Sequence, residues 1–157
     1  MKAQSGFTLV ELVLVAAIIG IVLAAVTLNF SQLNQKYAVE SYTKDIYTIL
    51  MQARNDASNI NSPCTVNLAA NEIRTVQDKN QDGDTTDQGE NVIHNFPRFT
   101  INFAADVLFD RRGLTNNLQT IRITGYSAKV EPTTDCIVIG PTRINIGKWT
   151  GGTCVQR

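Results

Sequence analysis

A run without any charged residue extends from Leu12 to Gln35 and constrains the fold more than any other feature of the chain. Its apolar part, LVLVAAIIGIVLAAV, is long enough with its flanks, as a helix, to cross a hydrocarbon layer about 30 Å thick. Glu11 stands at the head of this run. A carboxylate inside an apolar membrane segment costs roughly 2.5–3.5 kcal/mol, and less near the interface, so we expect Glu11 to have a specific partner.

A short leader precedes the apolar run. It contains one basic residue, Lys2, and ends in the small residue Gly6, which is followed by Phe7. An ordinary secretory signal places its cleavage site after the apolar run, behind small residues, and no such pattern follows here. A simple membrane anchor would not need Glu11. The sequence therefore favours processing ahead of the apolar segment, which is then retained.

The string GFTLVE, from Gly6 to Glu11, resembles the N-terminus of type IV prepilins, the precursors of the type IV pilin and pseudopilin superfamily. The resemblance implies that the prepilin peptidase cuts between Gly6 and Phe7 and methylates the new amino group of Phe7. It also implies that Glu11, fifth in the mature chain, neutralises the amino terminus of a neighbouring subunit. Phe7 and Glu11 would then act as an assembly pair in a filament.

Helical periodicity continues beyond the apolar run. Side chains suited to packing recur at three- and four-residue steps up to Ala57, which predicts one helix over residues 7–58. Gly20 is a point of local unwinding or of close helix packing. Many major pilins carry a proline near Thr27 to Asn29, and its absence here favours a minor pilin or pseudopilin. We expect four segments: a cleaved leader (1–6), a transmembrane and filament-core helix (7–30), its amphipathic continuation (31–58) and a β-rich head (59–157).

Beyond the helix, short runs rich in β-branched and aromatic residues alternate with turn residues, as in antiparallel sheets. The 157 residues leave room for one such head. We expect strands at residues 64–69, 72–77, 92–96, 100–105, 120–125, 136–140 and 143–149. The segments VLFDRRGL, TIRI, CIVI and TRINIGKW, which begin at Val107, Thr120, Cys136 and Thr142, resemble the C-terminal half of the GspH/FimT group of minor pilins and pseudopilins. The resemblance implies an α+β fold with a long N-terminal helix, transmembrane in its first half, packed on a mainly antiparallel, β-sandwich-like head.

The loop that starts at Asp78 carries oxygen-bearing side chains at alternate positions before Gly83, an arrangement that suits a hard cation. The position of the final EF-hand glutamate is Gly89 here, and no flanking helices are expected, so a true EF-hand is not predicted. An EF-like or thrombospondin-type Ca²⁺ loop and a solvated acidic turn are both open. The candidate ligands are Asp78, Asn80, Asp82, Asp84 through its carbonyl, Asp87 and Glu90.

Three cysteines in an exported head indicate one disulfide with one thiol left over, and three pairings are open. We favour Cys136 with Cys154, which would tie down the chain after Trp149. Loop-closure entropy would then contribute about 3 kcal/mol. Cys64 would be a buried free thiol in that case, and a bridge from Cys64 to either other cysteine stays open.

We predict that the protein is not an enzyme. His94 is the only histidine, and no nucleophile motif or phosphate-cradling loop accompanies it. Cys64 and His94 are the one pair to consider, but a thiol near a lone histidine in an exported head is far more often structural than catalytic.

Nucleic-acid binding is the alternative function, because some minor pilins of the GspH/FimT kind take up DNA with basic residues near the C-terminus. Those relatives carry a Gly-Arg-x-Arg pattern, and the matching residues here, 142–145, keep only the first arginine. Trp149 could stack on an unpaired base. The candidates for contact with double-stranded DNA are Arg143, Lys148 and Arg157, with Arg111 and Arg112 as secondary candidates.

The sequence thus predicts a minor pilin or pseudopilin that sits in the inner membrane by one helix, with its head in the periplasm, until it is extracted into a filament. The expected partners are other pilins, the prepilin peptidase, the inner-membrane assembly platform and membrane lipid. A type IV pilus, which reaches the cell surface, and a type II secretion pseudopilus use the same leader and helix, so both stay open.

Overall fold

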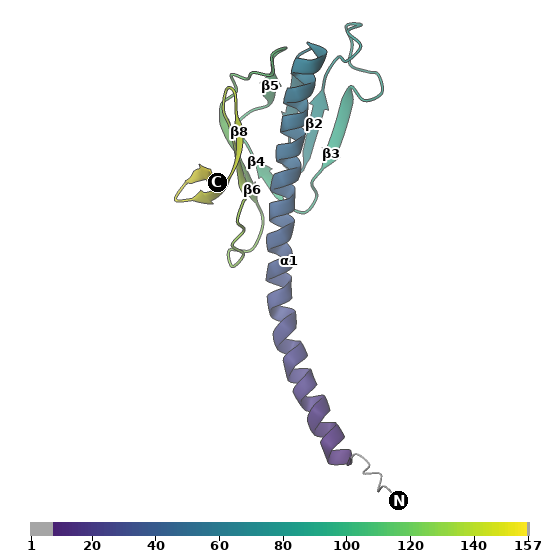
Figure 1. Cartoon of the computed structure of the whole chain (residues 1–157), viewed down its shortest axis with the longest axis vertical. Helices are drawn as coiled ribbons and strands as arrows, with labels where there is room; N and C mark the ends of the chain where they lie inside the picture. Colours follow the sequence, from purple (N-terminus) through teal and green to yellow (C-terminus); the bar gives the residue numbers. More distant parts are fainter. Residues whose placement is uncertain (1–7, 157) are drawn as a thin grey trace, which may run out of the picture.

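A long helix enters a head built from β-strands (Figure 1). The computed structural model describes residues 8–156, and only the backbone of residues 24–29. The predicted α+β order, one helix followed by antiparallel strands, is confirmed. In chain order the elements are α1 (Leu9–Ile60), β1 (Cys64–Leu68), β2 (Glu72–Val76), β3 (Asn91–Asn95), β4 (Thr100–Asn102), β5 (Val107–Phe109), β6 (Gln119–Thr124), β7 (Cys136–Ile139), β8 (Ile144–Thr150) and β9 (Thr153–Gln156).

Local interactions set both ends of α1. Thr8 caps the first turn, because its hydroxyl oxygen accepts the backbone N–H of Glu11 at 3.3 Å. At the other end, Asn61 adopts a left-handed conformation with a φ of 55°. The helix therefore runs past its predicted end at residue 58 and stops at this left-handed residue.

The two halves of α1 meet different surroundings. From Leu9 to Leu23 the large apolar side chains are exposed, Leu9 to 79% and Ile21 to 72%. Between Val39 and Ala57, by contrast, one stripe of the helix is buried in the head. Figure 1 shows the first part standing clear of the head and the second part lying along it.

Two antiparallel sheets form the head. The strand order is β3-β2-β1-β5 in one sheet and β4-β6-β7-β8-β9 in the other. Alternate residues of both sheets point inward and join the buried stripe of α1 in one hydrophobic core, because α1 contacts strands of both sheets. Fully or almost fully buried members of this core are Ile46, Leu50, Val66, Ile73, Val107, Phe109, Ile121, Ile123, Ile137 and Ile139.

Each of the seven expected strands is present, and two further strands fall outside the predictions. β5 and β9 are too short to show a recognisable alternation in the sequence. Pairing creates them: Val107 lies opposite Val66 on β1, and β9 returns along β8 after a turn at Gly151 and Gly152, which both have positive φ. The strand expected at 100–105 ends at Asn102.

A disulfide joins β7 to β9 across the strand between them. It links Cys136 to Cys154, the pairing favoured by the sequence analysis, and leaves Cys64 free and buried. Gly147 of β8 lies opposite Cys136 in register. A Cβ atom at this position would lie 2.5 Å from the carbonyl oxygen of Val155 and 2.8 Å from the Sγ of Cys154. The bridge in this geometry therefore requires glycine at position 147.

Candidate functional site

The predicted processing and assembly site lies at the start of α1. Gly6 and Phe7 are outside the described residues. Glu11 is in the first turn of the helix, where the helix dipole stabilises a negative charge. Its neighbours Val10 and Leu12 are 74% and 66% exposed. This end of the helix therefore suits burial against a surface that supplies both apolar contact and a cation.

The apolar surface continues upward along the helix through exposed side chains such as Leu14, Ile18 and Val22. Among the residues that the structure describes, no helix is both long enough and apolar enough to cross a membrane. The predicted transmembrane segment, 7–30, includes Phe7 and the side chains of 24–29, which lie outside the described residues. Its insertion into a bilayer stays a prediction.

The predicted calcium ligands lie in the loop between β2 and β3 and are tied to one another. Glu90 is 2% exposed, and its carboxylate accepts the backbone N–H groups of Lys79 at 2.7 Å and Asn80 at 3.2 Å. The side-chain amide of Asn80 donates to Asp82 at 2.8 Å and to Asp87 at 2.7 Å. Repulsion from Asp82, and then from Glu90, raises the pKa of Asp87. The loop thus concentrates negative charge.

The other two predicted ligands cap turns of the same loop. Asp78 accepts the backbone N–H of Gly83 at 3.1 Å. Asp84 accepts the N–H and the hydroxyl of Thr86, each at 2.9 Å, and these bonds lower the pKa of Asp84. Within residues 8–156, no three histidine, cysteine, aspartate or glutamate side chains converge as a metal-binding group. In this conformation the side-chain oxygens of the loop accept hydrogen bonds from donors of the same loop. Calcium binding stays a prediction.

Two of the predicted DNA-contacting residues lie along one strand. Arg143 is exposed directly before β8, and Lys148 is half-buried within it, about 17 Å further along at 3.4 Å per residue. Arg157 lies outside the described residues. Arg111 lines a groove together with Asp78, beside the acidic loop. The structure therefore gives Arg111 an acidic neighbour rather than a place on β8.

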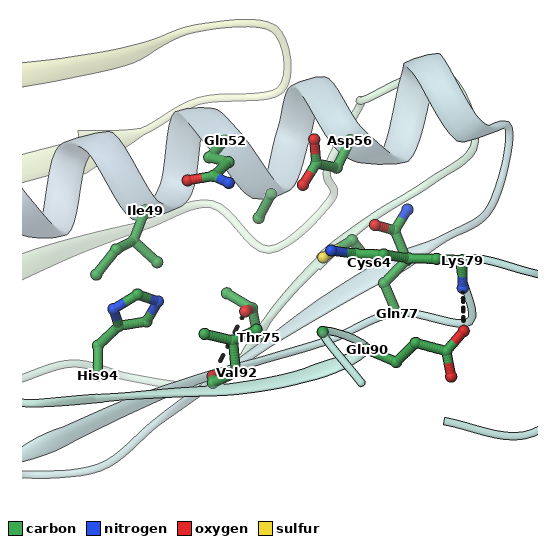
Figure 2. A pocket seen from close by; sticks show the side chains of 12 residues that line it. Ile49, Gln52, Asp56, Cys64, Thr75, Gln77, Lys79, Glu90, Val92 and His94 are labelled. Carbon is green, nitrogen blue, oxygen red and sulfur yellow. Dashed lines mark hydrogen bonds between the residues drawn. The ribbon is translucent and has the colours of Figure 1, made fainter. Parts of the chain in front are cut away.

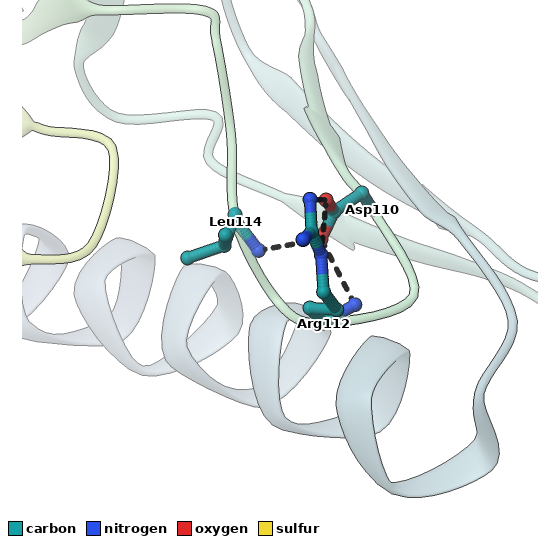
Figure 3. A network of polar contacts seen from close by, with 3 residues as sticks. All are labelled: Asp110, Arg112 and Leu114. Carbon is teal, nitrogen blue, oxygen red and sulfur yellow. Dashed lines mark hydrogen bonds and ion pairs between the residues drawn. The ribbon is translucent and has the colours of Figure 1, made fainter.

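Arg112 belongs to a closed turn after β5 (Figure 3). The carboxylate of Asp110 accepts the backbone N–H groups of Arg112 and Leu114, each at 2.9 Å, and pairs with the guanidinium of Arg112 at 3.2 Å. The N–H of Leu114, and then Arg112, hold the pKa of Asp110 below its usual value. Gly113 has a φ of 71°, and a Cβ there would lie 3.0 Å from the carbonyl oxygen of Arg54 on α1. The turn therefore docks tightly on the helix.

Trp149 sits in a polar cluster that the sequence analysis missed. The guanidinium of Arg122 lies 4.7 Å from the centroid of a Trp149 ring. Asp135 is 3% exposed and accepts the backbone N–H of Trp149 at 2.6 Å and the hydroxyl of Tyr126 at 2.5 Å. Burial, and then Asp135, raise the pKa of Tyr126 to about 12. Since Arg122 already lies over the Trp149 ring, less of that ring is free for base stacking.

The alternation in TIRIT predicts that Arg122 points away from the core, as it does. Its neighbour Trp149 is on a strand two places away in the sheet, with β7 between them. That neighbourhood depends on strand register, so no local sequence signal could have revealed the cluster.

A small pocket between α1 and the sheet of β1, β2 and β3 contains the free thiol (Figure 2). Cys64, Gln77 and His94 line this pocket. Burial, and then the charge of Asp56, raise the pKa of Cys64 to about 11, so the thiol stays protonated at neutral pH and is a poor nucleophile. The Oε1 of Gln77 is buried without a hydrogen-bond partner among the described residues. The pocket therefore holds no activated nucleophile at Cys64.

Comparison with known proteins identifies the first part of the chain. The family model described as the prokaryotic N-terminal methylation motif matches residues 1–27, which include Gly6, Phe7 and Glu11. Neither the curated proteins nor the solved structures gave a match. The motif points to a structural protein and, in general, to processing by the prepilin peptidase and assembly with other pilins. With a methylation motif that opens into a long N-terminal helix, followed by antiparallel sheets, the chain is a type IV pilin-like protein.

Proposed function

We propose that the protein is a minor pilin or pseudopilin, a filament subunit of a type IV pilus or of a type II secretion pseudopilus. The proposal rests on the difference in burial between the upper and lower parts of α1. Its upper part is buried in the head of its own chain, whereas the apolar side chains from Leu9 to Leu23 are exposed and lie within the methylation motif. Exposed apolar surface on this scale marks a site of contact with lipid or with other proteins.

Before assembly, the apolar half of α1 lies in the inner membrane as a single-pass anchor, and the head lies in the periplasm. Cleavage between Gly6 and Phe7 frees the amino group of Phe7, which is then methylated. In the filament, Glu11 of one subunit meets the amino group of Phe7 of the next subunit. An unpaired carboxylate is costly in an apolar filament core, so the register that pairs these two groups is favoured.

Two features support a minor subunit or a pseudopilin over a major pilin. Residues 27–29 contain no proline, in contrast to many major pilins. The strands β5 to β8 also carry the segments that resemble the GspH/FimT group.

Processing and assembly can be tested together in cells that contain a prepilin peptidase and an assembly platform. Mass spectrometry is expected to find a chain that begins at Phe7 and carries one methyl group. A Glu11→Gln variant is expected to be cleaved and membrane-bound but absent from sheared filaments. Glu72→Gln is the matched control, because Glu72 forms only a partly exposed ion pair with Arg74 on β2. Normal assembly of Glu11→Gln, or an uncleaved leader, would overturn the proposal.

A DNA-binding minor pilin for DNA uptake is the second candidate. Arg143 is exposed beside β8, and Arg122 adds a cation to the same sheet. Glu131 and Asp135 line the groove that contains Lys148, which weakens the local positive potential.

The DNA candidate can be tested by fluorescence anisotropy. Labelled duplex DNA is titrated with the full chain in detergent across a salt series, beside an Arg143→Ala, Lys148→Ala double variant. Salt-dependent binding that the variant loses would support DNA uptake. An intact chain that fails to bind at low salt would exclude it.

Calcium is proposed as a structural ligand of the acidic loop. Binding requires Asn80 to turn its amide oxygen toward Asp82 and Asp87, in place of the nitrogen that now donates to them. Titration of the full chain with CaCl₂, with MgCl₂ as the control, is expected to raise the melting temperature only with calcium. Asp82→Asn is expected to remove this rise.

A further inference from the structure

The lower rim of the head lies beside the point where the uncharged part of α1 ends. The loop over residues 125–131 lies against α1, because the backbone N–H of Ser127 donates to the side chain of Gln35 at 3.5 Å. Lys129 lines a groove with Leu33 and Lys36 of α1. Figure 1 shows this loop, in yellow-green, as the lowest part of the head.

Lys36 is the first charged residue after Glu11. Between these residues the helix rises roughly 38 Å, which exceeds a hydrocarbon layer of about 30 Å. With Glu11 at the inner side of a bilayer, Lys36 is therefore level with the outer headgroups. Leu33 is 45% exposed at this level and Tyr37 is 59% exposed. Tyrosine and lysine favour this interface, because their apolar parts lie toward the lipid and their polar ends reach water.

We propose that Leu33, Lys36, Tyr37 and Lys129 form a lipid-binding collar that seats the head on anionic phospholipid headgroups before the subunit is extracted. The proposal rests on the proposed function, because the collar can meet lipid only when α1 is in a bilayer. The ammonium groups of Lys36 and Lys129 bind headgroup phosphates, and the exposed side chains of Leu33 and Tyr37 enter the interface at the same level of α1. Because one lysine is on the helix and the other on the head, the collar sets how the head lies relative to the membrane.

Two nearby carboxylates affect the collar differently. Glu40, one turn above Lys36, accepts the backbone N–H of Thr133 at 2.7 Å and is therefore turned toward the head. Glu131 lines the same groove as Lys36 and Lys129 and offsets part of their charge. Removal of the Glu131 charge is therefore expected to strengthen the interaction with anionic lipid.

The test uses the full chain, one copy per nanodisc, in phosphatidylcholine alone or with added phosphatidylglycerol. A spin label at exposed Ala128, introduced as Ala128→Cys, reports collisions with a water-soluble nickel complex. Cys64 stays in place, because it is buried and protonated. Phosphatidylglycerol is expected to protect the label, since it favours the seated head.

Variants locate this effect. Lys36→Gln and Lys129→Gln are each expected to reduce the seated population about fivefold, and together they should abolish the effect of phosphatidylglycerol. Glu131→Gln should increase the protection. Lys44→Gln, at an exposed position on α1 about 12 Å above Lys36, is the matched control and should behave as the unchanged chain. Equal protection in both lysine variants and the unchanged chain would overturn the collar.

A second label at Val22, within the exposed apolar part of α1, reports insertion independently. A Val22 label in water would overturn the proposed membrane-anchored function. A Val22 label in lipid, with Ala128 equally accessible in both lipids, would overturn the collar alone. Protection of Ala128 that develops only in discs with several copies would assign this surface to a neighbouring subunit and overturn the lipid assignment.

Discussion

The lower and upper parts of α1 belong to one continuous helix but obtain their packing partners in opposite ways. Between Val39 and Ala57 the buried stripe contacts the sheets of the same chain. Between Leu9 and Leu23 the apolar side chains are exposed. Both parts are helical, so they differ only in what covers their apolar side chains. Folding of the chain buries the apolar stripe of the upper part, whereas the apolar side chains of the lower part can be buried only by lipid or by other subunits.

Truncation of a large side chain should separate the two parts most strongly. Leu50 is fully buried, so Leu50→Ala is expected to lower the free energy of unfolding of the head by about 2–5 kcal/mol. Leu14 is 58% exposed, and Leu14→Ala should leave head stability unchanged. Urea unfolding of the full chain in detergent, followed by the fluorescence of Trp149, measures both. Equal destabilisation by the two variants would contradict the division of the helix.

Loss of the disulfide tests whether the stability of the head depends on contacts within the head and not on the lower part of α1. Gly147→Ala is expected to prevent the bridge between Cys136 and Cys154 and to cost about 2–4 kcal/mol. Thiol titration and urea unfolding measure the two effects. Gly20→Ala is the matched control, since a Cβ at Gly20 meets nothing within 4 Å. A Gly147→Ala chain that keeps its bridge would contradict the close approach described above.

Cys64 reports how closely the upper helix covers the sheet. Folding raises its pKa from 9.0 to about 11, so its thiolate fraction at pH 8 should be about a hundredfold lower than in the unfolded chain. The neutral thiol stabilises the fold at pH values below 9, and this contribution is lost as the pH rises through about 11. Alkylation rates across pH measure the shift.

The control for this labelling is the denatured chain with its disulfide intact. Leu50→Ala should speed the alkylation of Cys64, because it loosens the packing between α1 and the sheets, whereas Leu14→Ala should not. An ordinary alkylation rate in the unchanged folded chain would show that the thiol is not shielded.

The smallest expected effect comes from two glutamates on the same helix. Glu40→Gln weakens the bond to the N–H of Thr133 and is expected to cost about 1 kcal/mol, or a few degrees in melting temperature. Glu11→Gln should leave the melting temperature of the head unchanged, because Glu11 lies far below it on α1. Thermal unfolding followed by circular dichroism compares them. A larger change in melting temperature for Glu11→Gln than for Glu40→Gln would contradict the conclusion that only the upper part of α1 stabilises the head.

Sequence reasoning was most successful where the signal is local. The long helix and seven strands follow from apolar periodicity and turn residues, and the methylation motif is recognisable from one short string around Gly6. Reasoning failed for β5 and β9, which are too short for alternation and exist because β1 and β8 offer them hydrogen-bonding edges. It also missed the contact of Arg122 with Trp149, since the register of three strands creates it.

The sequence by itself determined that a methylation motif over residues 1–27 overlaps an uncharged helical segment with a carboxylate at its head, because composition and spacing along the chain are sufficient for these properties. Only the tertiary structure decided which side chains share a site. It brought Cys136 to Cys154 across Gly147 and placed Lys129 beside Lys36 at the lower rim of the head. In the acidic loop it made the carboxylates accept hydrogen bonds from backbone N–H groups of the same loop. These neighbours are far apart in sequence, and strand pairing together with core packing brings them into contact.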